Sequence, residues 1–245
     1  MGKEPQHKYD ESKIKTLSSL EHIRLRTGMY IGRIGDGSNY DDGCYILLKE
    51  VIDNAIDEYI MGYGKEVQIL IEKGVVTVRD FGRGIPLGKV IECVSMINTG
   101  AKYNDDVFQF SVGLNGVGTK AVNALSEVFH VRSVRESKYS EATFVRGGLK
   151  DQNKGSCQNE PDGTFVRFVP DHKIFKKALF LDEIIDKRLK HYAYLNSGLR
   201  LSYNGKKYYS RKGLLDLIGE EIGDQAIYPP VYFATKTLEF SFTHS

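Results

Sequence analysis

The chain has 245 residues, which is enough for one large domain or two modest ones. Charged residues make up 27% and hydrophobic residues 41%, values typical of a soluble globular protein. The net charge of +2 excludes an overall basic field that would advertise binding to DNA or to an anionic membrane. The odd number of cysteines, without CxxC spacing, argues against a zinc site or a disulfide framework. No apolar run approaches the about 18 residues of a membrane span and no signal peptide is evident, so we expect a soluble, cytoplasmic protein without a membrane partner.

The N-terminal part is predicted to contain an arm, a short helix, a turn and a loop. Residues 1–15 are mostly polar and form the arm. Ser18–Arg26 forms a short helix that buries Leu20 and Ile23. Gly28–Gly32 forms a tight turn, and the Gly/Asp/Asn-rich segment Ile34–Gly43 forms a loop before the next helix.

The remaining elements follow from apolar periodicity and turn residues. Hairpins are predicted where β-branched or apolar runs flank Lys73-Gly74 and Asn204-Gly205. The predicted strands are Val67–Ile71, Val75–Arg79, Val128–Val134, Ala142–Arg146, Thr164–Val169, Leu199–Tyr203 and Lys207–Ser210. The predicted helices are Val90–Ile97, one opening at Ala121–Leu125, and Leu181–Leu195. Strands adjacent in sequence with helices grouped between them indicate an α+β sandwich, one mixed and mostly antiparallel sheet covered by helices on one face. This domain spans 16–228, and 229–245, with a strand at Leu238–Thr243, begins another.

The segment EVIDNAIDE places two different chemistries on two faces of one helix. Glu50, Asn54, Asp57 and Glu58 share one face, while apolar residues repeat the spacing on the other. An Asn oxygen is a neutral hard ligand for Mg²⁺, and a nearby Glu can take a proton from water. A solvated surface helix would show the same charged face, so the segment alone does not decide between these interpretations.

Two glycine-rich segments can be interpreted as turns or as nucleotide-binding loops. Asp80-Phe81-Gly82-Arg83-Gly84 closes a strand, and a carboxylate fixed there can accept a hydrogen bond from an exocyclic amine such as that of adenine. Gly113–Gly118 runs into a helix N-terminus, where free N–H groups attract phosphate. Its spacing is neither that of a Walker A loop nor that of a Rossmann fingerprint. Lys102 could add positive charge, although a lone loop lysine is usually exposed.

In this order the motifs resemble the GHKL ATPases, and within them the ATPase domain of bacterial type IIA DNA topoisomerases, that is, gyrase B or the ParE subunit of topoisomerase IV. The motifs that carry this resemblance are RTGMYIG (26–32), EVIDNAIDE (50–58), DFGRGIP (80–86), TGAKY (99–103), GLNGVG (113–118), VNALS (122–126) and GTFVRF (163–168). The resemblance runs from about Tyr9 to the end of the chain. It implies a Bergerat-type sandwich, ATP and Mg²⁺ as cofactors, and nucleotide-driven dimerisation that gates DNA strand passage. The segment Leu47–Glu50 with Gly113–Gly118 favours ParE over gyrase B.

The resemblance also implies a role for each matched residue. Glu50 would be the general base and Asn54 the ligand of Mg²⁺. Asp80 would bind the adenine amine with help from Thr164, and Arg83 would pair with Glu58 at the rim of the adenine pocket. The remaining implied contacts of the nucleotide pocket are Asp57, Gly84, Ile85, Pro86, Lys102, Gly113, Leu114, Asn115, Gly116, Val117, Gly118 and Arg135, the last at a mouth that gyrase inhibitors such as aminocoumarins contact. Tyr9 would reach from the arm into the nucleotide site of a second copy in a homodimer.

Some positions depart from the family pattern. Thr27 stands where many relatives have Pro, Asn115 where many have His, and Val112 where many have Gly. Ile46 occupies the position of a His that often lies one turn before the base, which leaves the orienting partner of Glu50 open. The implied partners are duplex DNA and the DNA cleavage protein, ParC or gyrase A. No residue here is assigned to DNA cleavage.

The activity expected of the chain itself is limited. A transducer domain would supply a lysine to the γ-phosphate, so we expect this chain to bind ATP, to hydrolyse it slowly and to dimerise poorly. The segment Asn98–Gly118 is expected to be mobile without nucleotide. Three alternatives remain: a nucleotide-dependent binding module without efficient hydrolysis, a MutL-like ATPase, and a histidine-kinase catalytic domain.

Overall fold

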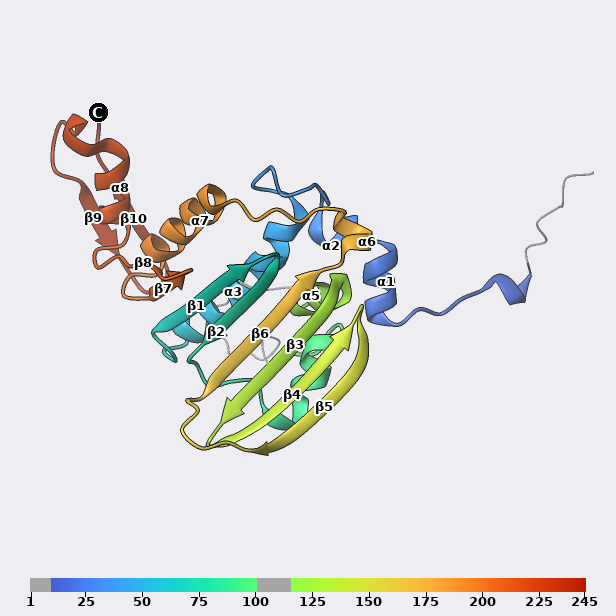
Figure 1. The fold of residues 1–245 in the computed structure, drawn as a ribbon. Coiled ribbons are helices and arrows are strands. Elements are labelled where there is room, and N and C mark those ends of the chain that lie inside the picture. Colours follow the sequence, from blue (N-terminus) through green and yellow to red (C-terminus); the bar gives the residue numbers. More distant parts are fainter. Residues whose placement is uncertain (1–9, 101–115) are drawn as a thin grey trace, which may run out of the picture.

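The computed structural model describes residues 10–100 and 116–245, and its centre is one eight-stranded sheet (Figure 1). The strand order is β5-β4-β3-β6-β2-β1-β7-β8. The strands are β1 (Glu66–Glu72), β2 (Val75–Asp80), β3 (Ser126–Arg135), β4 (Lys138–Val145), β5 (Gly148–Ser156), β6 (Gly163–Pro170), β7 (Arg200–Tyr203) and β8 (Lys206–Tyr208). Only β1 and β7 pair in parallel, so the predicted mixed, mostly antiparallel sheet is confirmed.

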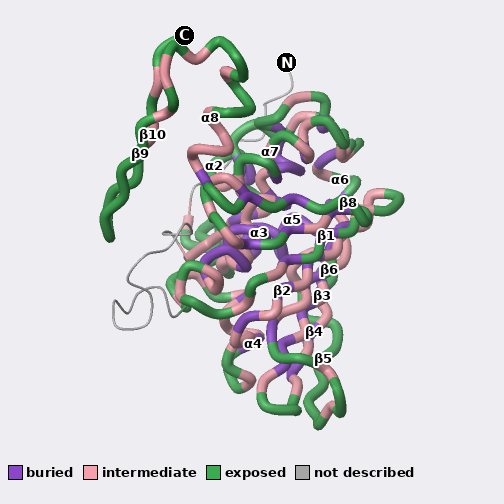
Figure 2. Tube along the Cα trace, turned by 90° about the vertical axis from the view of Figure 1, so that its left-hand side faces the viewer, coloured by how far each residue is buried: buried purple, intermediate pink, exposed green. Residues whose placement is uncertain are grey.

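Helices cover one face of this sheet, as predicted. The longest is α3 (Gly43–Ile60), which packs on β2 and β6, while α5 (Gly118–Leu125) packs on β3 and β6. The short α4 (Val90–Ser95) lies on β3 and β4, and α7 (Asp182–Leu195) packs on β7 and β8. In β2 the buried residues alternate as Val76, Val78 and Asp80, which is the period that one covered face requires. Figure 2 shows the buried residues gathered along α3, α5 and the strands next to them.

Two short helices form the N-terminal part of the described chain. In α1 (Ser19–Leu25), Ser18 caps the helix with Glu21, and the predicted core residues Leu20 and Ile23 are buried. The predicted turn at Gly28–Gly32 is wrong in detail, because Gly28–Ile31 forms one helical turn, α2. Gly32 ends α2 with a φ of +65°, a conformation that glycine adopts without strain.

Several elements of the structure were not predicted from the sequence. Strand β5 is exposed along its whole length, so no apolar alternation marks it. The short α6 (His172–Phe175) and the helix α8 (Leu214–Ile222) were also missed. The predicted strand at Leu238–Thr243 is present as β10 (Glu239–Phe242), which pairs with the unpredicted β9 (Val231–Ala234) in a separate two-stranded sheet.

The 3-10 turns of the described chain are Glu11–Lys13, Leu87–Lys89 and Gly223–Gln225. None of the helices within 10–100 and 116–245 is both long enough and apolar enough to cross a membrane.

Candidate nucleotide site

The site begins on α3, whose carboxylate at Glu50 lies against the first residue of α5. A methyl group placed on Gly118 would come within 1.8 Å of Glu50 Oε2. The carboxylate therefore occupies the space beside the N-terminus of α5, where backbone N–H groups have no partner within the helix and the helix dipole favours negative charge. Only a residue without a side chain allows this approach.

Asn54 lies one turn after Glu50 and connects α3 to α5. Its Nδ2 donates to Glu50 O and to Thr119 Oγ1, both at 2.8 Å. These two bonds fix the plane of the amide, so the direction of its oxygen is set as well. Thr119 was missed in the sequence, since a threonine in the first turn of a helix is unremarkable without its partner on α3.

Asp80 ends β2 and is buried beneath the loop that follows it. Its Oδ1 accepts hydrogen bonds from Gly82 N at 2.9 Å and from Thr164 N at 3.0 Å. Neither of these two hydrogen bonds involves the second carboxylate oxygen, Oδ2. Burial raises the pKa of Asp80 to about 6, against the lowering effect of the two backbone hydrogen bonds. The structure therefore holds one carboxylate oxygen by backbone donors and leaves the other for a donor such as an exocyclic amine.

Glycines around Asp80 allow three backbone segments to meet. At Gly163 φ is +135°, and a methyl group there would lie 2.3 Å from Asp80 O. At Gly84 φ is +72°, and a methyl group would lie 2.7 Å from Val134 O. L-residues rarely adopt these conformations, so the loop after β2 and the start of β6 depend on both glycines.

Glu58 and Arg83 form the predicted pair. Glu58 Oε2 accepts from Arg83 N at 2.9 Å and Nε at 3.1 Å, and Oε1 accepts from Nη2 at 3.0 Å. The Arg83 guanidinium also lies over the ring of Tyr63, 4.2 Å from its centroid. This arrangement holds the loop Phe81–Pro86 against the C-terminal half of α3.

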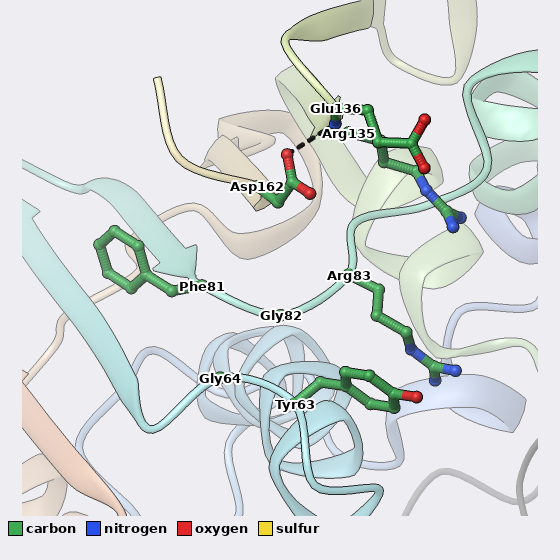
Figure 3. A pocket seen from close by; sticks show the side chains of 8 residues that line it. All are labelled: Tyr63, Gly64, Phe81, Gly82, Arg83, Arg135, Glu136 and Asp162. Atoms are coloured by element: carbon green, nitrogen blue, oxygen red, sulfur yellow. Dashed lines mark hydrogen bonds between the residues drawn. The ribbon is translucent and has the colours of Figure 1, made fainter. Parts of the chain in front are cut away.

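A cavity of about 320 Å³ opens beside this pair, and Figure 3 shows the side chains that line it. Arg135, at the end of β3, lines it together with Arg83, and its Nη1 lies 3.5 Å from Gly84 O. The opposite charges are Glu136 and Asp162, with Glu136 N donating to Asp162 Oδ1 at 2.8 Å. The cavity is thus open, polar and flanked by two guanidinium groups, which suits a ligand with carbonyl, hydroxyl or anionic oxygens.

The other predicted residues lie at the start of α5, in the loop after β2, on α3, or outside the described part of the chain. Gly116 has a φ of +61° and Val117 is the N-cap of α5, so the end of the glycine-rich segment leads into this helix as expected. Ile85 O accepts from Ser133 Oγ at 2.7 Å, Pro86 is exposed and Asp57 is buried. The residues that lie outside the described part of the chain are Tyr9, Lys102, Gly113, Leu114 and Asn115.

The structure supplies polar neighbours for α3 that the sequence did not indicate. Ile46, at the position where relatives often have His, is a hydrocarbon side chain packed against the core. Asp53, buried on α3, contacts Lys49 and accepts a hydrogen bond from Tyr192 Oη at 2.5 Å. No sequence signal links Tyr192 to Asp53, because these two residues are far apart in the chain.

A second cluster of ligand-type residues lies apart from these loops. Glu127, Asp171 and His172 have side-chain atoms close enough to share a metal ion. Arg24 and Arg146 pair with Asp171, and Arg146 also pairs with Glu127. Two guanidinium groups already balance the carboxylates, so this cluster is an ion-pair network joining α1, the start of β3, the turn between β4 and β5, and the N-terminus of α6.

A fold with one mixed sheet, a long helix bearing Glu50 and Asn54, and a buried Asp80 beside glycines defines the class of protein. The family model described as histidine kinase-, DNA gyrase B- and HSP90-like ATPase matches residues 39–173, and the chain belongs to this family. The predicted GHKL assignment is confirmed, and membership implies that the chain binds ATP.

Among its relatives, the B subunit of DNA topoisomerase 4 from Borreliella burgdorferi is 60% identical over 97% of this chain and 40% of its own length. The corresponding protein of Mycoplasma capricolum is 36% identical over 89% of this chain and 36% of its own length. The B subunit of DNA gyrase from Mycoplasma pneumoniae is 38% identical over 80% of this chain and 31% of its own length. The chain therefore spans two fifths or less of these relatives.

The fold is also that of a solved relative, the 43K ATPase domain of Thermus thermophilus gyrase B in complex with an aminocoumarin. The TM-score is 0.74 at 29% identity, over 92% of this chain and 62% of that one.

Proposed function

We propose that this chain is the ATP-binding and hydrolysing module of a bacterial type II DNA topoisomerase, with topoisomerase IV favoured over gyrase. The observation that carries the proposal is the approach of Glu50 to the N-terminus of α5, with Asp80 buried at the end of β2. The Glu50 carboxylate suits the attacking water, the N-terminus of α5 suits the phosphates, and Asp80 suits the base of a nucleotide. The 60% identity to the B subunit of a topoisomerase 4 supports the choice of topoisomerase IV.

In this proposal the nucleotide lies between α3, the loop after β2 and α5. The adenine amine donates to Asp80 Oδ2, and Thr164 adds a hydroxyl beside it. The phosphates meet the N–H groups of Gly116, Val117 and Gly118, whose helix dipole favours negative charge. The remaining pocket contacts proposed from the family pattern are Asp57, Gly84, Ile85, Pro86, Lys102, Gly113, Leu114, Asn115 and, at the mouth, Arg83, Glu58 and Arg135.

Glu50 acts as the general base in this scheme. It orients a water molecule toward the γ-phosphate and holds at a carboxylate oxygen the proton that this water loses. The transferred group needs little covalent help from the protein, so positioning and charge neutralisation carry most of the catalysis.

Asn54 fits a magnesium site by the chemistry of its donor set. Its nitrogen is engaged by Glu50 O and Thr119 Oγ1, so its oxygen, a neutral hard ligand, is directed by the structure. Mg²⁺ bound there would neutralise phosphate charge.

The whole-protein roles follow the same proposal. Residues 16–228 form the ATPase domain, and 229–245 begin a transducer domain. Nucleotide binding closes a homodimer, in which Tyr9 of the arm (1–15) reaches the site of the second copy. The further partners are duplex DNA and a DNA cleavage protein of the ParC or gyrase A type, with decatenation favoured over supercoiling as the readout. The protein acts in the cytoplasm, and the cavity between Arg83 and Arg135 accepts aminocoumarins.

Two variants test the proposal by separating binding from hydrolysis. Calorimetric titration with a non-hydrolysable ATP analogue and Mg²⁺ should show saturable binding to the wild type and to Glu50→Ala, and none to Asp80→Ala. Phosphate release should stop in Glu50→Ala. If Glu50→Ala still hydrolyses ATP, Glu50 is not the base. If Asp80→Ala binds normally, the adenine site lies elsewhere.

A further inference from the structure

The loop that joins β5 to β6, residues 157–162, is held by a row of side chains on the sheet face opposite α3 and α5 (Figure 1). Val78 and Asp80 of β2 are buried on the helix side, so Arg79, between them, points to the opposite face. Residues that oppose each other in an antiparallel pair share a face. The row that continues from Arg79 across β6, β3 and β4 is therefore Phe165, Arg132 and Glu141.

Arg132 holds the loop at Glu160. Its Nε donates to Glu160 Oε1 at 3.1 Å and its Nη2 donates to Oε2 at 2.7 Å, which is a two-point contact between guanidinium and carboxylate. The same guanidinium is fixed on β4, where Nη1 donates to Glu141 Oε2 at 2.7 Å and the group lies 3.7 Å from the centroid of the Tyr139 ring. The hydrogen bonds from Arg132 lower the pKa of Glu160, so this carboxylate is ionised at neutral pH.

The next two residues of the loop are held as well. Arg79 Nη2 donates to Pro161 O at 2.5 Å, and Glu136 N donates to Asp162 Oδ1 at 2.8 Å. Proline has a fixed φ and restricts the residue before it, so Glu160 and Pro161 form a stiff pair. A contact made at Glu160 is therefore carried along the backbone to Asp162 with little freedom between them.

This loop leads directly into the candidate site through Gly163 and Thr164. Gly163 lies so close to Asp80 that a methyl group on it would be 2.3 Å from Asp80 O. Thr164 N donates to Asp80 Oδ1 at 3.0 Å, and the other donor to this oxygen is Gly82 N. Because the two donors come from different segments, the place of Thr164 N helps to set the plane of the carboxylate and the direction of Oδ2.

We propose that Arg132 and Glu160 are positioning residues for recognition of the adenine base, acting through the backbone of Thr164. By fixing the end of the loop, the pair sets Thr164 N against Asp80 Oδ1 and so directs Asp80 Oδ2 toward the exocyclic amine. Both residues act from the opposite face of the sheet. This inference rests on the proposed role of Asp80 in binding adenine.

Glu141 provides a matched control, because Arg132 binds two carboxylates and only one of them belongs to the loop. The Glu160 and Glu141 side chains are similarly exposed, at 31% and 24%. Glu160→Gln and Glu141→Gln each remove one charge from the same guanidinium and keep the shape of the side chain. Glu160→Gln weakens the hold on the loop, whereas Glu141→Gln changes only the contact with β4.

The first measurement is calorimetric titration with ADP and with inosine diphosphate, which has a carbonyl oxygen in place of the adenine amine. The wild type should bind ADP more tightly, since Asp80 Oδ2 accepts from the amine and repels the carbonyl. In Glu160→Gln the affinity for ADP should fall about fivefold and that for inosine diphosphate should stay within about twofold, the range expected of a partly exposed ion pair. Glu141→Gln should keep the wild-type ratio of the two affinities. A merely structural role would weaken both ligands together and leave that ratio in place.

Hydrogen exchange without nucleotide measures the loop itself. Exchange of the Thr164 amide should quicken about fivefold in Glu160→Gln and stay within about twofold of the wild type in Glu141→Gln. The amides of β1 should keep their protection in both variants, which separates a local change from a loss of the fold.

The outcomes separate this inference from the function on which it rests. A wild-type ratio of affinities in Glu160→Gln, or the same change in Glu141→Gln, overturns the positioning role. If the wild type binds ADP and inosine diphosphate equally, Asp80 does not read the adenine amine, and both the proposed adenine site and its positioning by Arg132 and Glu160 are refuted. Faster Thr164 exchange confined to Glu160→Gln would in that case still show that the pair anchors the loop.

Discussion

Gly118 should be required for hydrolysis and dispensable for folding. In Gly118→Ala the new methyl group would meet Glu50 Oε2 at 1.8 Å and Cδ at 2.7 Å, far inside an ordinary contact of 3.4 Å. Both atoms belong to the end of a flexible side chain, so the carboxylate rather than the backbone gives way. It must withdraw by roughly 1.6 Å, and a catalytic group misplaced by about 1 Å can cost on the order of 10² in rate. We therefore expect kcat to fall about 100-fold, or about 2.7 kcal/mol of transition-state stabilisation.

The same substitution should leave the fold intact or stabilise it. Gly118 is in the first turn of α5 and its φ is not positive, so alanine fits the backbone. Alanine is favoured over glycine in helices by up to about 1 kcal/mol, so the free energy of unfolding should rise by about 0–1 kcal/mol. Phosphate release, urea denaturation and calorimetric binding of a non-hydrolysable ATP analogue measure the three quantities on one sample.

Gly219→Ala is the matched control, because Gly219 lies within α8 and a methyl group there meets nothing within 4 Å. It should gain the same helical stability and keep full hydrolysis. Wild-type turnover by Gly118→Ala would refute the reasoning, since Glu50 would then work from another position. A stability loss above about 1 kcal/mol would show that the backbone moved instead of the carboxylate.

Three further predictions concern Asp80, the Glu58–Arg83 pair and Gly163, which contact the loop after β2 or lie in it. Because burial raises the pKa of Asp80 to about 6, folding favours the protonated form of this side chain. The stability that Asp80 contributes is therefore full below about pH 4 and is lost as the pH rises through about 6, a loss on the order of 3 kcal/mol. Denaturation from pH 4 to 7 should show this decline in the wild type, and a decline of the same size in Asp80→Asn would contradict the prediction. In a double-mutant cycle of Glu58→Gln and Arg83→Ala followed by urea denaturation, the partly exposed pair should couple by about 1–2 kcal/mol, and strictly additive effects would argue against it. Gly163→Ala should destabilise the fold by about 3 kcal/mol or more, because φ is +135° and the new methyl group meets the backbone oxygen of Asp80. Gly205→Ala is the control: its φ is also positive but the space around it is open, so the free energy of unfolding should fall by only about 1 kcal/mol. Equal losses in the two variants would mean that the contact with Asp80 O does not matter.

The elements with one covered face were the predictable ones. In β2 and in α3 the apolar residues recur with the period of the element, so a local pattern reveals both the element and its buried side. Strand β5 has polar or small residues on both faces, apart from Leu149, and owes its conformation to pairing with β4. Its existence depends on a neighbour, and no local pattern reports that.

The candidate site also has a part that could be predicted from the sequence and a part that could not. Glu50 and Asn54 could be placed together because helical spacing alone puts them on one face, and the pairing of Glu58 with Arg83 came from the family pattern. The contact of Glu50 with Gly118 and the bond from Asn54 to Thr119 join α3 to α5, which are far apart in the chain.

By itself the sequence determined which residues could carry the chemistry and which face of each helix or strand is apolar, because residue type and periodicity are local properties of the chain. Only the tertiary structure decided which of these groups meet. It set Glu50 against the N-terminus of α5, and it buried Asp80 deeply enough to raise its pKa. It also brought Tyr192 to Asp53 across 139 residues. Distances, burial and pKa values depend on the packing of several segments at once, and no single segment contains that information.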